Sequence, residues 1–249
     1  MKRRYFVYLT FKGTDFHGWQ VQPNGRSVQG ELEKALRTLL QEKIALSGAG
    51  RTDTGVHAKC MIAHFDTDQN IVNDNFIFNL NNLLVDSISI DSLREVKFDF
   101  HARFDAISRT YQYVITPKKD PFQSEFAHRY TKKMDIDSMN IAAKKMLGER
   151  DFSCFSKSKT QTYTNNCNLQ KAEWRERDGL FIFEIKANRF LRNMVRAIVG
   201  TLLEVNEGKR TMESIPELLE SKNRSNAGVS APAKGLYLVD IEYPPKGFI

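Results

Sequence analysis

Residues 50–58 read GRTDTGVHA and place one carboxylate, Asp53, in a short loop rich in glycine and threonine. The glycines near it are Gly48, Gly50 and Gly55. Glycine lets a backbone adopt positive φ and lets a ligand approach closely. The hydroxyl groups of Thr52 and Thr54 can hydrogen-bond local amides and hold a carboxylate in place. From these residues alone, the loop is either a solvated turn, which the composition favours, or the seat of a reactive carboxylate.

The segments before and after this loop predict strands and helices in turn. Residues 4–11 (RYFVYLTF) are aromatic and β-branched, which is typical of a buried strand. Ser27 can cap a helix whose apolar positions recur at helical spacing, namely Val28, Leu32, Ala35, Leu36, Leu39 and Leu40. After the loop we expect a strand near 60–66, a helix near 74–84 and a strand near 88–98.

After residue 105 a second series of strands and helices begins. Residues 108–116 alternate, with Tyr111, Tyr113 and Ile115 on one face of a strand. The later elements expected are a helix near 137–147, strands near 169–176 and 180–187, a long helix at 188–206, a shorter helix at 211–221 and a strand at 236–243. The fold class predicted is therefore α+β, with two similar half-domains, 1–105 and 106–249, sharing a mostly antiparallel sheet flanked by helices.

The composition narrows the classes of partner and site. A formal charge of +7 and a pI near 9.2 are compatible with a polyanionic partner but do not by themselves establish one. No apolar run approaches the roughly 18 residues of a membrane helix, and the N-terminus shows no cleavage site of a signal peptide. We therefore expect a cytoplasmic protein. The cysteines, Cys60, Cys154 and Cys167, are odd in number and far apart, which argues against disulfides and a zinc site.

The loop GRTDTGVHA resembles the active-site loop of the TruA family of tRNA pseudouridine synthases, whose pattern is G-R-T-D-x-G-V-H-A. Further segments agree with that family in order along the chain: FHGWQVQ (16–22), FHARFDA (100–106), SRTYQY (108–113), NRFLRNMVRAIVG (188–200) and APAKGLYLVDIEYP (231–244). The resemblance spans residues 4–244. It implies the pseudouridine synthase fold and an isomerase that converts uridine to pseudouridine in tRNA.

The resemblance assigns the role of catalytic nucleophile to Asp53. The reaction breaks the N1–C1′ bond of uridine and forms a C5–C1′ bond, so it needs a carboxylate near the junction of sugar and base. It requires no metal and no organic cofactor. Whether the carboxylate attacks C1′ or the uracil ring stays open. The expected target is a uridine of the anticodon stem-loop, at positions 38–40, flipped out of its stack, and the family implies a homodimer.

Three further residues match positions of the family's site. Tyr111 would stack on the uracil, and its phenol could assist removal of the C5 proton; the competing interpretation is a core aromatic. Arg196 lies between apolar residues and matches the arginine that pairs with the catalytic aspartate, which would keep Asp53 ionised. Leu238 matches the apolar residue that supports the uracil, although core packing explains it equally well.

Basic residues are the expected contacts to the RNA backbone. They are Arg51, Arg109, Arg189 and Arg192. Arg189 and Arg192 fall with Arg196 on one side of the expected helix 188–206, and a solvated basic face and RNA contact explain these two equally well. His57 is expected to be a structural hydrogen bonder and not a base.

One segment departs from the family. Within TYTNNCNLQKAEW (162–174), Cys167 stands where relatives commonly carry an arginine. The polar segment SKSKTQTYT (156–164) before it is expected to be a flexible loop that faces the RNA.

Three other functions fit parts of this pattern. The same chemistry could act on a different uridine or RNA. The scaffold could be a non-catalytic RNA-binding module or a tRNA-folding chaperone, although a binder has no need of a carboxylate facing phosphates. An N-glycosidase would use the same carboxylate but let water capture the sugar. The reaction product distinguishes them: pseudouridine, unchanged RNA or free uracil.

Overall fold

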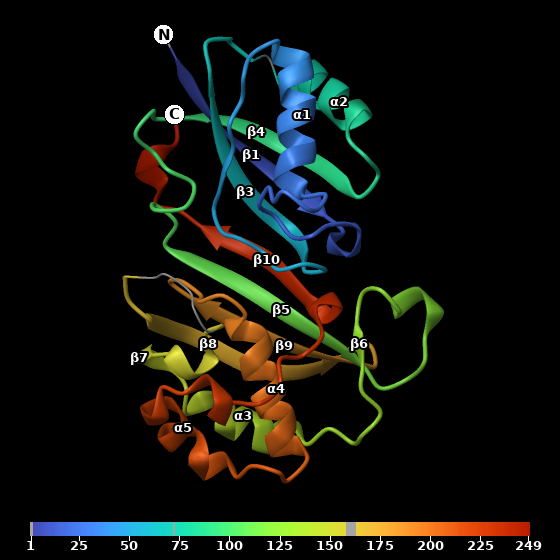
Figure 1. Cartoon of the computed structure of the whole chain (residues 1–249), viewed down its shortest axis with the longest axis vertical. Coiled ribbons are helices and arrows are strands. Elements are labelled where there is room, and N and C mark those ends of the chain that lie inside the picture. The colour runs from blue at the N-terminus through green and yellow to red at the C-terminus, as the bar shows by residue number, and fades with distance from the viewer. Residues whose placement is uncertain (1, 72, 158–162) are drawn as a thin grey trace. The chain divides into compact units, whose positions relative to one another are not determined.

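The computed structural model describes residues 2–71, 73–157 and 163–249. The chain divides into two compact units (Figure 1). The first consists of Met1–Ile107 and Leu238–Ile249, and the second of Ser108–Tyr237. Most of the segment expected to face RNA, residues 158–162, lies outside the described residues.

The first unit is built on antiparallel strands with two helices packed beside each other (Figure 1). Its elements are β1 (Arg3–Phe11), α1 (Val28–Leu40), β2 (Ser47–Gly48), β3 (His57–Thr67), α2 (Asn73–Leu83), β4 (Ile88–Val96) and the part of β10 (Leu236–Glu242) from Leu238 onward. β1 pairs antiparallel with both β3 and β4, and β2 pairs with β3. β10 follows β3 in the strand order.

The sequence explains why α1 begins and ends where it does. Ser27 is its N-cap, and the Ser27 hydroxyl oxygen accepts a hydrogen bond of 3.2 Å from the amide of Gly30. The helix ends at Gln41, which adopts a left-handed conformation with φ of 54°. Its buried face consists of Val28, Leu32, Ala35, Leu36 and Leu40. The capped helix predicted after Ser27 is confirmed.

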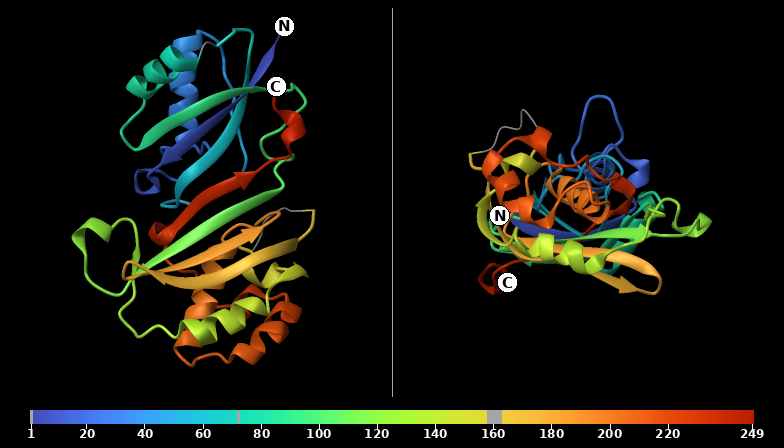
Figure 2. Two further views of the ribbon diagram at one scale, coloured as in Figure 1. Left: turned by 180° about the vertical axis from the view of Figure 1, so that it is seen from behind. Right: turned by 90° about the horizontal axis from the view of Figure 1, so that it is seen from below.

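The second unit repeats the combination of antiparallel strands and helices. Its elements are β5 (Ser108–Thr116), β6 (His128–Arg129), α3 (Ile136–Lys144), β7 (Gly148–Asp151), β8 (Asn166–Arg177), β9 (Leu180–Ala187), α4 (Met194–Asn206) and α5 (Ile215–Ser221). The strand order is β5-β9-β8-β7, with every pair antiparallel, and β6 pairs parallel with β5. α3 contacts β8 and α5 contacts β7, so these helices lie beside the strands at the β8–β7 end of the strand order (Figure 2).

Short 3-10 turns connect several of these elements. They occur at Gly13–Asp15, Pro121–Gln123, Ser153–Phe155, Met212–Ser214, Arg224–Asn226, Ala233–Gly235 and Pro245–Gly247. The two units thus each confirm the predicted α+β class, with mostly antiparallel strands flanked by helices.

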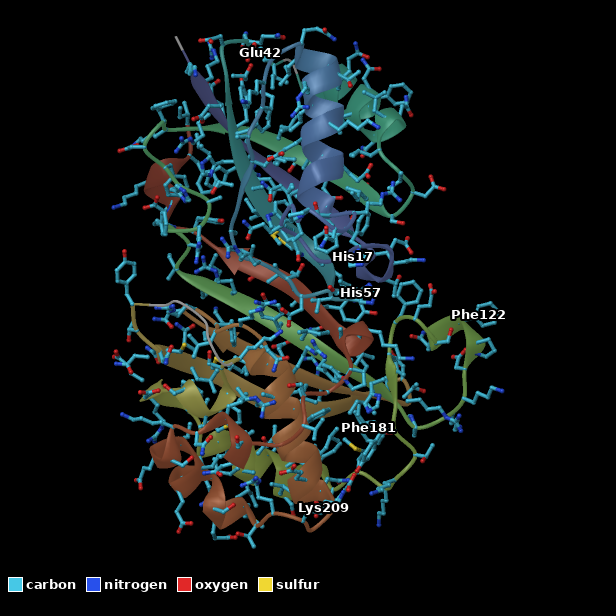
Figure 3. All side chains as sticks on the ribbon, in the orientation of Figure 1. His17, Glu42, His57, Phe122, Phe181 and Lys209 are labelled. Carbon is cyan, nitrogen blue, oxygen red and sulfur yellow. The ribbon has the colours of Figure 1, made fainter. Side chains whose placement is uncertain are left out.

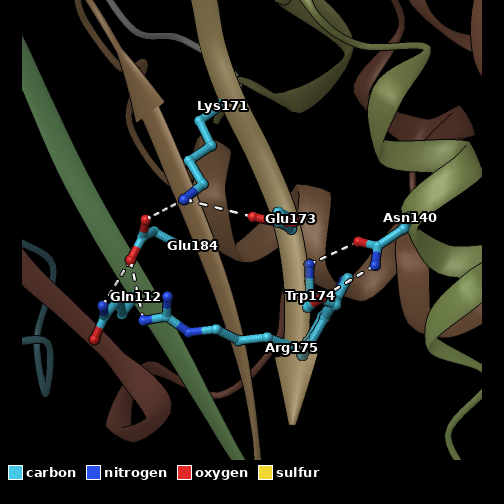
Figure 4. Close-up of polar contacts among 7 residues, drawn as sticks. All are labelled: Gln112, Asn140, Lys171, Glu173, Trp174, Arg175 and Glu184. Atoms are coloured by element: carbon cyan, nitrogen blue, oxygen red, sulfur yellow. Dashed lines mark hydrogen bonds and ion pairs between the residues drawn. The ribbon is translucent and has the colours of Figure 1, made fainter. Parts of the chain in front are cut away.

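The two faces of the second sheet differ in chemistry (Figure 4). Trp174 packs on Phe183 with ring centroids 5.0 Å apart, and the Asn140 side chain of α3 bonds both the amide and the carbonyl of Trp174. Glu184 lies between two buried residues of β9 and therefore points to the opposite face. There its carboxylate accepts hydrogen bonds from Lys171 at 2.7 Å and Gln112 at 2.8 Å.

The long helix predicted at 188–206 is wrong in its first turn and a half, since α4 begins at Met194. Asn193 has φ of 67°, a left-handed conformation that breaks the helix before it starts. Asn188 is held instead by Asn168: the Asn188 amide donates to the Asn168 carbonyl, and the Asn168 amide donates to the Asn188 side chain. Arg189 and Arg192 therefore precede the helix and do not share a helical side with Arg196. Likewise, residues 212–214 of the helix predicted at 211–221 form a 3-10 turn.

The boundary between the units differs from the division at 105/106 made from the sequence. It falls after Ile107, and the C-terminal segment belongs with the first unit. Three contacts hold that segment there: Ile107 donates its amide to the Glu242 carbonyl, Lys97 donates its amide to the Gly247 carbonyl, and the Tyr243 hydroxyl donates to the Ala102 carbonyl. Across the described ranges, no helix has the length and apolar character needed to cross a membrane.

Candidate active site

Asp53 lies in the loop between β2 and β3, at the first position of a tight turn. Its carbonyl accepts a hydrogen bond of 3.2 Å from the amide of Val56. Gly55, inside the turn, has φ of 78°, a conformation that favours glycine. Asp53 itself is half-buried. The turn therefore fixes the backbone of the aspartate while leaving its side chain partly accessible.

The segment around residues 13–19 packs against this loop. The Trp19 amide donates to the Thr52 carbonyl at 3.4 Å. Gly18 has φ of 89°, and a Cβ there would lie 2.4 Å from the Thr52 carbonyl oxygen. A Cβ at Gly13 would lie 1.9 Å from the Val56 carbonyl oxygen. The two glycines thus allow a backbone-to-backbone contact that any larger residue would prevent.

His57 fixes the exit of the loop into β3. It is buried, and its Nδ1 accepts a hydrogen bond of 3.1 Å from the amide of Gly13 (labelled His57 in Figure 3). A ring nitrogen that accepts carries no proton, so this contact requires the other nitrogen to carry the single proton of a neutral ring. The prediction that His57 is a structural hydrogen bonder is confirmed.

Two of the three glycines near Asp53 have a structural reason to be glycine, and the third does not. Gly55 needs positive φ, as above. A Cβ at Gly48 would lie 2.6 Å from the indole ring of Trp19, so size decides that position. Gly50 has neither constraint, because a Cβ there would meet nothing within 4 Å. The open space beside Gly50 leaves one side of the loop approachable.

Two other predicted site residues belong to the first unit. Arg51 has an exposed side chain next to the turn, as a contact to phosphate requires. Leu238 is 1% exposed, which fits core packing and is compatible with a role under the uracil. The Thr52 hydroxyl beside Asp53 is buried and, among the described residues, has no hydrogen-bond partner.

Tyr111 lies on β5 in the second unit. Its ring contacts Phe190 edge-to-face, with centroids 5.1 Å apart, and remains half-buried. Tyr113, two residues on, is fully buried and donates its hydroxyl to the Pro232 carbonyl at 2.8 Å. Burial raises the pKa of Tyr113 far above its ordinary value. The strand therefore carries one core tyrosine, Tyr113, and one partly accessible tyrosine, Tyr111.

Arg196 lies in the first turn of α4. Its Nε donates to the Ala231 carbonyl at 2.7 Å, and the Arg196 carbonyl accepts from the Ala231 amide at 2.9 Å. The segment around Ala231 thus holds both the backbone and the guanidinium of Arg196. Asp53 belongs to the first unit and Arg196 to the second, and their ion pair stays a prediction.

The remaining basic residues occupy three settings. Arg109 on β5 donates to the Asn188 carbonyl at 2.9 Å. Arg189 is half-buried, and Arg192 is exposed with its carbonyl accepting from the Lys157 amide at 3.0 Å. Cys167 is buried, and burial raises the pKa of its thiol to about 11, an effect that the nearby Arg189 opposes. A buried thiol therefore occupies position 167.

Metal binding and thiol chemistry can be judged from the residues that the structure describes. Within them, no three His, Cys, Asp or Glu side chains gather in a way that could hold a metal ion. Burial raises the pKa of the Cys60 thiol to about 11 and that of Cys154 to about 12. These thiols stay protonated near neutral pH and are poor nucleophiles.

Comparison with known proteins identifies the family. The sequence profile described as tRNA pseudouridine synthase matches residues 9–105 and 142–244. The chain belongs to the tRNA pseudouridine synthase family. This membership confirms the resemblance drawn from the motifs, and with it the enzyme class, an isomerase. Asp53, Arg196 and Leu238 lie inside the matched ranges, whereas Tyr111 lies between them.

Full-length relatives support the same family. The chain is 49% identical over 245 residues to tRNA pseudouridine synthase A of Bacteroides thetaiotaomicron, covering 97% of this chain and 91% of that protein. It is 47% identical to the protein of the same name from Parabacteroides distasonis, covering 99% of this chain and 98% of that protein. The corresponding protein of Bacteroides fragilis is 48% identical, with coverage of 99% and 98%.

Proposed function

We propose that this protein isomerises uridine to pseudouridine in the anticodon stem-loop of tRNA, at positions 38–40, with Asp53 as the nucleophile on a flipped-out uridine. The observation that carries the proposal is the Asp53 turn. In a member of the tRNA pseudouridine synthase family, a partly accessible carboxylate is held on a fixed backbone by Gly13, Gly18 and His57. A carboxylate fixed in this way suits attack on a reacting atom, because little ordering remains to be done when the substrate binds.

The reaction proposed is an isomerisation in which atoms balance. The N1–C1′ bond breaks, the Asp53 carboxylate holds the sugar or the ring covalently, and the uracil turns to present C5. The C5–C1′ bond then forms, C5 loses its proton and N1 gains one. Asp53 leaves unchanged, so the step needs no oxidant and no added group.

The other site residues have supporting roles in this proposal. Tyr111 stacks on the everted uracil and assists removal of the C5 proton. Arg196 pairs with the Asp53 carboxylate, favouring its charged form and directing it. Leu238 supports the base from the other side. Tyr111 and Arg196 are each held within the second unit, by Phe190 and Ala231 respectively.

The protein binds the RNA through charge and shape. The chain carries a net charge of +7, and Arg51, Arg109, Arg189 and Arg192 are the proposed contacts to phosphates. Structured RNA is bound largely through its backbone, so tRNA affinity should fall steeply with added salt. By analogy with the family, the proposal includes a cytoplasmic homodimer in which one tRNA spans both subunits.

The experiment that tests the proposal maps pseudouridine in tRNA. Total tRNA from cells with and without the gene is compared at single-nucleotide resolution, and purified protein is incubated with an unmodified tRNA transcript. Loss of pseudouridine at positions 38–40 in cells, and its appearance in the transcript, is expected. Free uracil would indicate an N-glycosidase, and unmodified RNA that nonetheless binds would indicate a non-catalytic module. Pseudouridine at another position would keep the chemistry and change the target.

A further inference from the structure

The segment HARFDA (101–106) folds into a turn whose backbone is held by its own side chains. The His101 amide donates to the Asp105 carboxylate at 2.7 Å, and the Asp105 amide donates to the His101 carbonyl at 3.1 Å. The Arg103 amide donates to Nδ1 of the His101 ring at 3.0 Å. Three backbone amides, those of His101, Arg103 and Asp105, are thus hydrogen-bonded inside these six residues, which restricts the conformational freedom of the turn.

Two contacts anchor the same turn to the sheet of the first unit. The buried Ala102 donates its amide to Nδ1 of His64 on β3 at 3.2 Å, and its carbonyl accepts from the Tyr243 hydroxyl at 2.5 Å. The His64 and His101 rings meet edge-to-face, 4.5 Å apart. The turn is therefore fixed both internally and against β3.

This rigid turn presents an aromatic ring to solvent. Phe104 is 75% exposed. Its inner side lies on the His101 ring, with centroids 4.3 Å apart and planes tilted by 34°. The Arg103 guanidinium carbon lies 5.7 Å from the centre of the Phe104 ring. A single exposed apolar side chain is ordinary on a protein surface, but this one lies against the His101 ring on one side and has a cation beside it.

The turn is connected directly to the Asp53 loop. Ser47 in β2 pairs with His64 in β3, and the Ser47 hydroxyl lies 3.5 Å from Nε2 of His101. β2 ends at Gly48, where the chain enters the loop that carries Asp53. The turn that carries Phe104 and the strand that leads into the proposed catalytic loop therefore contact each other through Ser47 and His101, within one unit.

We propose that Phe104, with Arg103 beside it, forms a stacking platform for an unpaired nucleobase of the tRNA, and so acts as a positioning residue for the substrate. This inference rests on the proposed function. Unstacked bases are recognised by aromatic faces and by arginine guanidinium planes.

The first test reads stacking without reading activity. Phe104→Trp retains an aromatic ring and adds a fluorescent reporter at the platform, whereas the native Trp19 and Trp174 are buried. Titration with an unmodified tRNA transcript should quench the new fluorescence by stacking. The matched control is Phe78→Trp on α2 of the same unit, where the native ring is 64% exposed. Quenching at Phe78→Trp equal to that at Phe104→Trp, or none at either, would overturn the proposal.

The second test measures affinity for tRNA. Phe104→Ala should weaken binding by about 5- to 150-fold, the range for loss of one base–aromatic stack. Phe104→Tyr should bind as the parent does, and so should Phe78→Ala. Unchanged affinity of Phe104→Ala would contradict the platform. Light scattering on the same variants detects the alternative, a contact with a second copy of the chain: a change of mass in Phe104→Ala would assign the ring to a subunit interface and overturn the proposal.

The two proposals fail separately. If the parent protein forms pseudouridine and tRNA leaves the Phe104→Trp signal unchanged, the platform is wrong and the proposed function stands. If tRNA quenches that signal and the parent forms no pseudouridine, the platform binds RNA in a protein whose activity was misassigned.

Discussion

The amide of Gly13 donates a hydrogen bond to Nδ1 of His57, with 3.1 Å between the two nitrogens. The contact is buried and joins the segment after β1 to the first residue of β3. His57 lies four positions after Asp53. This bond therefore fixes the point at which the chain passes from the proposed catalytic loop into β3. Several predictions of the account concern the framework around this contact.

His57→Leu should destabilise the protein, because the buried Gly13 amide then has no acceptor. Leaving a buried donor unsatisfied costs about 1–3 kcal/mol. His57→Asn places a side-chain oxygen near the position of Nδ1 and should recover part of the loss. Urea unfolding monitored by tryptophan fluorescence measures both. Equal stability of His57→Leu and the parent would show that the hydrogen bond contributes nothing.

Gly13→Ala and Gly50→Ala form a matched pair on either side of the loop. A Cβ at Gly13 would lie 1.9 Å from the Val56 carbonyl oxygen, whereas a Cβ at Gly50 meets nothing within 4 Å. Gly13→Ala should therefore lower the free energy of unfolding by about 1–3 kcal/mol or more, and Gly50→Ala should leave it nearly unchanged. Thermal unfolding midpoints compare the two, and similar losses in both variants would contradict the close packing described.

The His64 ring should make stability depend on pH. Burial, then the charge of Arg4 and the ring of His101, lowers the pKa of His64 from its ordinary 6.5 to about 4, an effect that Asp66 opposes. The folded state therefore favours the neutral ring, and the unfolded state takes up the proton first as the pH falls. The contribution of His64 to the free energy of unfolding is complete above the pKa of the unfolded state, and it is lost as the pH falls from 6.5 toward 4.

The check compares the parent with His64→Asn, whose side-chain oxygen can still accept from the Ala102 amide. Urea midpoints are measured from pH 7.5 down to the onset of acid unfolding. The parent should lose stability more steeply than the variant over this window, by on the order of 1–3 kcal/mol in total. Parallel pH profiles would show that His64 does not titrate differently in the folded state.

Tyr111→Phe should slow pseudouridine formation while leaving tRNA affinity within a few-fold of the parent. The substitution keeps the ring that is proposed to stack on the base and removes the phenol that is proposed to assist proton removal. General acid–base assistance typically contributes about 100- to 10,000-fold, so a loss of rate toward the lower end is expected. Single-turnover rates measured beside Tyr113→Phe, which alters only a core hydroxyl bonded to Pro232, separate chemistry from stability. Identical rates for Tyr111→Phe and the parent remove the proton-transfer role.

Periodic elements of the fold could be predicted from the sequence, and contacts between distant residues could not. Strand 4–11 follows from its aromatic and β-branched residues, and the helix after Ser27 follows from the helical spacing of its apolar residues and a capping hydroxyl. The start of α4 was missed because Phe190 and Leu191 continue the apolar spacing of a helix. The helix starts at Met194 because Asn193 is left-handed and because Asn188 is paired with Asn168. The pairing depends on β8, a separate strand, so local spacing does not reveal it.

The candidate site shows the same division. The resemblance of GRTDTGVHA to the family's active-site loop points to Asp53 as the proposed nucleophile, whereas its residue types alone favour a solvated turn. It does not reveal what supports the loop, since Gly13 and Gly18 are isolated glycines whose need for a hydrogen side chain appears only against the carbonyls of Val56 and Thr52. The anchoring of the HARFDA turn could not be predicted either, because it depends on a hydrogen bond to His64 in β3.

The measurement that tests the central claim most directly is single-turnover pseudouridine formation on an unmodified tRNA transcript by Asp53→Asn at saturating enzyme. The substitution preserves size and removes the charge and the nucleophile. Asp68→Asn, at an exposed position of the same unit, is the control. We expect no product from Asp53→Asn, tRNA binding within a few-fold of the parent, and parental rates from Asp68→Asn. Product formation by Asp53→Asn at a rate near that of the parent would contradict the account.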